Sequence, residues 1–144
     1  MITDEGPPDR AAMLAAVPLL SKLDWDQIGV LAEVGEYQVF QEGEVIVGQG
    51  EKGLGLYLIV DGLADVRRSG RLVATLSAGK FFGESALIVE APRTADVVAA
   101  TDVRCFVVTR WDFWSAIGVD PETNRRLFVE TVRRLRSFTA ELVE

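Results

Sequence analysis

Hydrophobic and polar positions follow two different rhythms along this chain. Between residues 10 and 20, and again after Asp24, apolar residues recur at every third or fourth position, which predicts two short helices. Pro18 would lie near the end of the first helix, and the Asp24 side chain would cap the second. From residue 36 to about residue 110, short apolar runs alternate with turns that contain glycine, a pattern typical of β-strands.

The β region contains eight such runs. Glycine occupies most of the turns between them, as expected where the backbone needs a positive φ. Short strands at this close and regular spacing predict an antiparallel sandwich or jelly roll. The runs span residues 36–40, 44–47, 56–60, 63–67, 72–76, 80–82, 95–99 and 103–109.

The last part of the chain returns to helical spacing. Residues 110–117 predict a short helix whose three aromatic residues pack against the rest of the domain. A longer helix is expected over residues 120–144, with Pro121 in its first turn. Its apolar positions repeat every seven residues, so it would serve either as a lid on the β domain or as the seam of a homodimer. We expect three units: a disordered tail over residues 1–9, a domain over 10–119, and this C-terminal helix.

Composition narrows the class of function. Of the 144 residues, 49% are hydrophobic and 26% are charged, which is enough apolar material for a globular core. The net charge of -7 argues against DNA as a partner, because duplex binding relies on cations that neutralise phosphates. The chain has no histidine, which excludes a Ser-His-Asp triad, a Cys-His dyad and a histidine-ligated metal. We also find no clustered carboxylates or activated nucleophile, so we expect neither a metal site nor an enzyme.

The cellular compartment is predicted from the first residues of the chain, its single cysteine and the length of its apolar runs. Cys105 lies in an apolar run and is expected to be a buried structural thiol in a reducing environment. The first nine residues are acidic and proline-rich, unlike the basic start of a signal peptide. No apolar run approaches the roughly 18 residues that a membrane span needs. These features predict a cytoplasmic protein without a membrane partner.

One interruption of the β region differs from a hairpin turn. After Gly83, residues 84–88 have the composition of a single helical turn, and Pro92 ends the segment. The start of such a turn offers free backbone N–H groups to an anion, and Arg93 would lie near the same anion with its forked guanidinium. Read from the residues alone, Glu84 and Arg93 would equally suit an ordinary salt bridge.

This segment resembles the phosphate-binding cassette of cyclic nucleotide-binding domains. The family pattern is F-G-E-x-A-L, a short loop, and P-R-[AST]-A; the chain has Phe82–Leu87 and Pro92–Ala95 at these positions. Residues 50–62 resemble the family's G-E-x … L-Y-x-I-x-x-G stretch, and residues 17–23 resemble its helical entry. The likeness covers roughly residues 14–140. It implies an eight-stranded antiparallel jelly-roll barrel (a double-stranded β-helix), mainly β, with flanking N-terminal helices and C-terminal lid or hinge helices.

The resemblance also implies a role for each matching residue. Glu84 would accept a hydrogen bond from the ribose 2′-hydroxyl, and the backbone amides of Gly83, Ser85 and Ala86 would face the ribose and phosphate. Arg93 would neutralise the cyclic phosphodiester. Further contacts are expected beside the phosphate and base (Thr94), on an apolar wall against the base (Val66, Val73 and Ala74), and on the C-terminal lid (Phe138 and Thr139).

The function implied is that of a non-catalytic regulatory module whose ligand is a cyclic nucleotide, with no other cofactor. Thr94 would suit the amino group of a syn guanine, but hydroxyl residues at this position also occur in cAMP binders; we favour cAMP over cGMP. Occupancy would be relayed through the C-terminal helix to an effector protein or an output domain. Two alternatives to this function stay open. The chain would be the sensor half of a catabolite-activator-type transcription factor, or it would be a degenerate docking module that no longer binds nucleotide.

Overall fold

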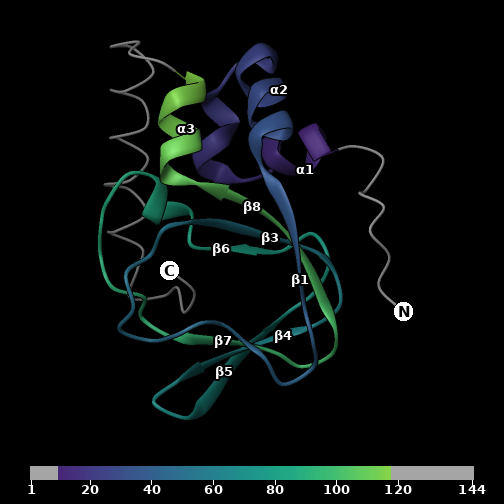
Figure 1. The fold of residues 1–144 in the computed structure, drawn as a ribbon, viewed down its shortest axis with the longest axis vertical. Coiled ribbons are helices and arrows are strands. Elements are labelled where there is room, and N and C mark those ends of the chain that lie inside the picture. The colour runs from purple at the N-terminus through teal and green to yellow at the C-terminus, as the bar shows by residue number, and fades with distance from the viewer. Residues whose placement is uncertain (1–9, 118–144) are drawn as a thin grey trace.

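The helices at the start of the fold pack side by side on one face of a sheet. The computed structural model describes residues 10–117 (Figure 1). It begins with the α-helix α1 (Arg10–Ala15), the 3-10 helix η1 (Pro18–Lys22) and the α-helix α2 (Trp25–Val34). The Asp24 side chain accepts a hydrogen bond from Gln27 N (2.8 Å), and the Gln27 side chain accepts one from Asp24 N (3.0 Å). This capping box confirms Asp24 as the N-cap.

The prediction of a single helix from residue 10 to about residue 20 is wrong. The backbone of Val17 is extended, with φ -73° and ψ 122°, so the chain turns after α1. Pro18 is then the first residue of η1 and not the end of α1. Proline suits this position because the first N–H groups of a helix have no intrahelical partner in any case.

All eight predicted runs form strands, whose ends differ from the prediction by one residue at most. They make two antiparallel sheets of four strands, in the orders β1-β8-β3-β6 and β2-β7-β4-β5. This confirms the expected mainly β, antiparallel fold with flanking helices, although the two sheets lie face to face and do not form a closed barrel. The strands are β1 (Glu36–Phe40), β2 (Val45–Val47), β3 (Gly55–Asp61), β4 (Ala64–Arg68), β5 (Arg71–Leu76), β6 (Phe81–Phe82), β7 (Asp96–Ala99) and β8 (Val103–Thr109).

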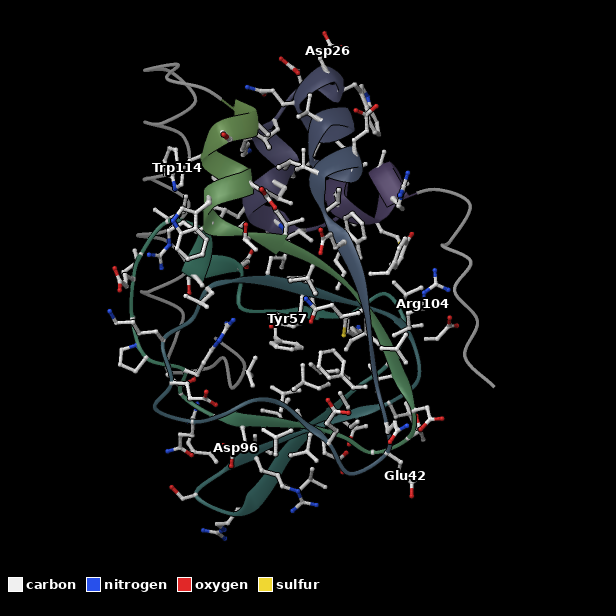
Figure 2. The ribbon with its side chains drawn as sticks, in the orientation of Figure 1. Asp26, Glu42, Tyr57, Asp96, Arg104 and Trp114 are labelled. Carbon is white, nitrogen blue, oxygen red and sulfur yellow. The ribbon has the colours of Figure 1, made fainter. Side chains whose placement is uncertain are left out.

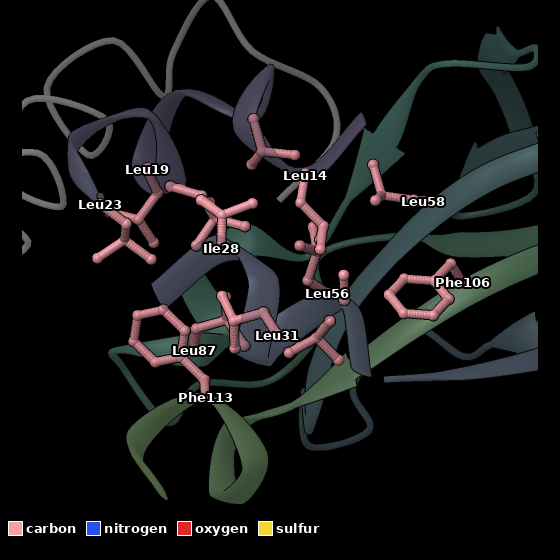
Figure 3. Close-up of a cluster of buried hydrophobic side chains, with 14 residues drawn as sticks. Leu14, Leu19, Leu23, Ile28, Leu31, Leu56, Leu58, Leu87, Phe106 and Phe113 are labelled. Carbon is pink, nitrogen blue, oxygen red and sulfur yellow. The ribbon is translucent and has the colours of Figure 1, made fainter. Parts of the chain in front are cut away.

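Within the β1-β8-β3-β6 sheet, the strands β3 and β8 are buried on both faces. On β3, Leu56 and Leu58 pack against the helices, as Figure 3 shows, whereas Tyr57 and Ile59 face the interior between the sheets. This alternation follows from the two-residue period of a strand. Cys105 on β8 faces the same interior, where burial raises the pKa of its thiol to about 12. The expectation of a buried thiol is therefore confirmed.

The described part of the chain ends in α3 (Arg110–Ile117), which confirms the short helix predicted there. Phe113 is fully buried against the N-terminal helices, but Trp111 is exposed and so is no packing anchor. The predicted tail, the long C-terminal helix, Phe138 and Thr139 lie outside the described residues. None of the helices within residues 10–117 is long and apolar enough to cross a membrane.

Candidate functional site

The cassette begins with a glycine that no other residue could replace without strain. Gly83 follows β6 with φ +79°, in the left-handed region, and the 3-10 helix η2 (Glu84–Leu87) starts directly after it. A Cβ on Gly83 would lie 2.7 Å from Gly55 O and would overlap the Arg93 guanidinium. The turn therefore brings the backbone of the cassette into direct contact with the side chain of its own return leg.

Arg93 is almost fully buried, with 6% of its surface exposed. Its Nη2 donates to Gly55 O at 2.9 Å, and its guanidinium carbon lies 5.8 Å from the Tyr57 ring centre and 6.0 Å from that of Phe82. These two rings are stacked with centres 4.9 Å apart. The backbone is fixed as well, because Arg93 N donates to Glu51 O at 2.7 Å. The guanidinium thus lies over the Tyr57 and Phe82 rings and is fixed there by its hydrogen bond to Gly55 O.

Glu84 has a partner that the sequence did not reveal. Its side chain is fully buried, and Oε2 accepts a hydrogen bond from Leu19 N at 3.1 Å. Because Leu19 belongs to the first turn of η1, the carboxylate ties the cassette to the N-terminal helical segment. Residues 17–23 resemble the family's helical entry, but we predicted no contact between them and the cassette from the sequence.

A cavity of about 140 Å³ opens beside Arg93. Apart from Arg93, the lining residues were not predicted as site residues; among them is Tyr57, which strand alternation places on the opposite face of β3 from Leu56 and Leu58. Figure 2 shows Tyr57 between the two sheets. Burial raises the pKa of Tyr57, an effect that the charge of Arg93 partly offsets. The phenol is therefore a neutral hydrogen-bond donor at neutral pH. The lining residues are Ile46, Val47, Glu51, Lys52, Leu54, Tyr57 and Arg93.

The other predicted site residues fall into two groups. Gly83, Glu84 and Ala86 are buried in the cassette near Arg93, and Ser85 and Thr94 are partly exposed there. The proposed apolar wall lies in the opposite sheet: Val66 pairs with Ala74 across β4 and β5, and with Val73 they join the cluster between the sheets. Of all the predicted residues, Arg93 lines the cavity itself.

The hairpin tip between β4 and β5 is attached to the cassette. Arg68 Nε donates to Thr94 O at 3.3 Å, and Ser69 N donates to Gln49 Oε1 at 3.0 Å. The tip thus approaches both the return leg of the cassette and the β2–β3 loop. Within residues 10–117, we find no group of three His, Cys, Asp or Glu side chains that could hold a metal ion.

Comparison with known sequences agrees with this geometry. A family model described as "Cyclic nucleotide-binding domain" matches residues 37–119. The chain is 42% identical over 108 residues to the cAMP-dependent protein kinase regulatory subunit of Schizosaccharomyces pombe, covering 74% of this chain and 26% of that protein. It is 31% identical over 130 residues to cGMP-dependent protein kinase 2 of Mus musculus, covering 84% of this chain and 17% of that protein. The chain therefore spans about a quarter or less of these relatives.

Solved structures give the same answer for the fold. The N-terminal domain of a transcriptional regulator from Streptomyces coelicolor superimposes with a TM-score of 0.74 at 26% identity, covering 92% of this chain and 98% of that one. A cyclic nucleotide-binding-like protein from Brucella abortus superimposes with a TM-score of 0.72 at 24% identity, covering 76% and 97%. Sequence and structure together show that the chain belongs to the cyclic nucleotide-binding domain family.

Proposed function

We propose that this chain is a non-catalytic regulatory module that binds a cyclic nucleotide, with cAMP preferred to cGMP, in the site around Arg93. The observation that carries the proposal is the position of the Arg93 guanidinium, which is buried, oriented by Gly55 O and in the lining of a cavity. A cation fixed in a poorly solvated place attracts an anion more strongly than one in water. A cyclic phosphodiester carries one such negative charge, in a protein whose net charge is -7.

The remaining contacts follow from the same placement. The amides of Gly83 and Ser85 at the start of η2 face the ribose and phosphate, because the first N–H groups of a helical turn lack intrahelical partners. The Ala86 N–H, by contrast, already donates to Gly83 O at 3.1 Å. The Glu84 carboxylate accepts a hydrogen bond from the ribose 2′-hydroxyl. A carboxylate has about four lone-pair sites, so the hydrogen bond from Leu19 N leaves capacity for a second donor. Tyr57 adds a neutral O–H at the floor of the cavity.

The preference for cAMP is supported by the apolar character of the wall formed by Val66, Val73 and Ala74. These side chains offer no hydrogen-bond partner to the exocyclic groups of guanine. The similarity to a cAMP-dependent kinase regulatory subunit also supports this choice.

Occupancy is relayed through residues 120–144 to an effector protein or an output domain. A second candidate, the sensor half of a transcription factor, is favoured by the likeness to the N-terminal domain of a transcriptional regulator. In both cases the chain itself does the sensing, in the cytoplasm, with the nucleotide as its ligand.

Titration calorimetry with cAMP, cGMP and 5′-AMP tests the proposal. We expect cAMP to bind best and 5′-AMP, which lacks the ring, to bind weakly. Arg93→Ala should lower affinity for cAMP at least about tenfold, since a hydrogen bond to a charged group contributes roughly 1.5–3 kcal/mol. Arg71→Ala is the matched control, because it removes the same charge from an exposed position. Absence of heat and of thermal stabilisation with both cyclic nucleotides would show the proposal to be wrong.

A further inference from the structure

Arg110 contacts three segments around the site: the helix η2, the β2–β3 loop and the loop that follows η2. It is the first residue of α3, and its backbone N–H donates to Leu54 O at 2.9 Å. The side chain is mostly buried, with 18% of its surface exposed. Its Nε donates to Ala86 O at 2.9 Å, and its Nη2 donates to Gly53 O at 3.2 Å. One guanidinium thus bonds to both the cassette helix and the β2–β3 loop.

The outer edge of the same guanidinium reaches the variable loop of the cassette. Nη2 also lies 3.5 Å from Val89 O, and Nη1 lies 3.4 Å from a Glu90 carboxylate oxygen. Glu90 in turn forms a 2.7 Å ion pair with Lys52 of the β2–β3 loop. A planar fork with five N–H donors can serve several acceptors at once, which the single ammonium of lysine cannot do in the same geometry.

Trp114 repeats the contact one helical turn later. Its Nε1 donates to Leu87 O at 2.8 Å. Positions 110 and 114 lie on one face of α3, and they take the carbonyls of two successive residues at the end of η2. Figure 2 shows Trp114 at the side of α3. The last carbonyls of a short helix need partners from elsewhere, and α3 supplies them.

The β2–β3 loop transmits this restraint to Arg93. A Cβ built on Gly53 would lie 3.1 Å from Ala86 Cβ and 3.3 Å from the Arg93 guanidinium carbon. Gly53 is therefore wedged between the cassette helix and the side chain that faces the ligand. Because Arg110 donates a hydrogen bond to Gly53 O, a change in the angle of α3 would shift Gly53 relative to Ala86 and the Arg93 guanidinium.

We infer that Arg110, assisted by Trp114, is a positioning residue for the nucleotide site. It holds η2 and the β2–β3 loop at the separation that lets the η2 amides and Arg93 act on one anion. It also makes α3 move with the cassette when the ligand binds. This inference rests on the proposed function, since it assigns the regulation of that same site to particular side chains.

The experiment compares the wild-type chain with Arg110→Lys, Arg110→Ala and Trp114→Phe. Arg110→Lys keeps the charge and a partner for Glu90 but loses the forked hydrogen bonds. Trp114→Phe keeps an aromatic side chain but removes the N–H donor together with part of the ring system. Arg71→Ala is the control at an exposed site. Affinity for cAMP is measured by calorimetry, and hydrogen exchange of residues 110–117 is measured with and without saturating cAMP.

We expect Arg110→Lys to lower affinity about tenfold or more, and Trp114→Phe to lower it several-fold. At saturating cAMP, wild type should change its exchange in residues 110–117, and Arg110→Lys should change it much less. A purely structural role would lower stability in the free and bound chain alike and leave this ligand-induced difference intact, which would overturn the inference. If Arg110→Ala does not fold, the other two variants decide. Wild type that binds no nucleotide refutes the proposed function and the inference together, whereas wild-type binding with unaltered variants refutes the inference alone.

Discussion

Replacing Gly83 by alanine tests whether the close contact between the cassette backbone and Arg93 matters for binding. The substitution has two separate costs. An L-residue in the left-handed region, where Gly83 has φ +79°, is less stable by about 1–2 kcal/mol. The new Cβ would also lie 2.7 Å from Gly55 O and overlap the Arg93 guanidinium.

The side chain of Arg93 must yield, because Gly55 belongs to β3 and is held by its pairing with Thr109 on β8. Moving Arg93 removes its 2.9 Å hydrogen bond to Gly55 O, a charged hydrogen bond that contributes roughly 1.5–3 kcal/mol. We therefore expect Gly83→Ala to lower the free energy of unfolding by about 2.5–5 kcal/mol. Affinity for cAMP should fall at least about tenfold.

Gly79→Ala is the matched control. Gly79 has φ +91°, but a Cβ there would have no atom within 4 Å. It should therefore lose only the conformational part, about 1–2 kcal/mol, and keep its nucleotide affinity. Urea unfolding measures both free energies, with an unchanged slope as the condition for comparing them. Equal destabilisation in the two variants, or normal affinity in Gly83→Ala, would refute the steric argument.

Three further outcomes follow from the site. Glu84→Ala should lower the free energy of unfolding, measured by chemical denaturation, by about 1.5–3 kcal/mol, because Leu19 N loses a charged acceptor. In calorimetry, Glu84→Gln should bind 2′-deoxy-cAMP and cAMP with more similar affinities than wild type does. Tyr57→Phe should keep the stacked ring and the stability but bind cAMP several-fold more weakly; unchanged affinity would remove the phenol from the site. Hydrogen exchange with cAMP should change most in residues 82–95 and 118–144, and a ligand that leaves 118–144 unaltered would exclude this segment as the relay.

Local rules account for what the sequence predicted well. The strands were found because each has an apolar run bounded by turn residues, and Asp24 was found because a cap needs only its own side chain and the next turn. The interruption between β6 and β7 was found in the same way, from Gly83 and Pro92, but its identification as a phosphate-binding cassette rested on the resemblance to the family. These features depend on a few neighbouring residues, so one sequence is enough to indicate them.

Contacts between distant residues account for what was missed. Leu19 and Glu84 are 65 positions apart, and their hydrogen bond joins a backbone N–H, which every residue except proline has, to a carboxylate. No residue type at position 19 could have signalled it. Arg110 likewise bonds mainly to backbone carbonyls, so its role leaves no pattern of paired side chains. Whether the sheets close is also decided by pairing across the whole fold, and strand runs alone do not indicate it.

The ion pairs around Glu90 give the site a dependence on pH whose sign can be worked out. The hydrogen bond from Lys52, and then the charges of Lys52 and Arg110, hold the pKa of the Glu90 carboxyl below its ordinary value of 4.5. A carboxyl whose pKa is lower in the folded chain adds stability above its unfolded value, and this stability is lost as the pH falls through the folded value.

Unfolding of wild type and Glu90→Gln should therefore be compared from pH 7 down to about pH 3. We expect wild type to be the more stable of the two at neutral pH, by a small margin because Glu90 is half exposed and solvent screens its charge. The margin should begin to shrink near pH 4.5 and disappear once the pH has fallen below the lower pKa of the folded chain, where the carboxylate is protonated. Glu33→Gln, at an exposed position on α2, controls for the loss of one negative charge. A margin that persists unchanged into acid would mean that the Glu90 carboxylate does not join the cassette to Lys52 and Arg110 in solution.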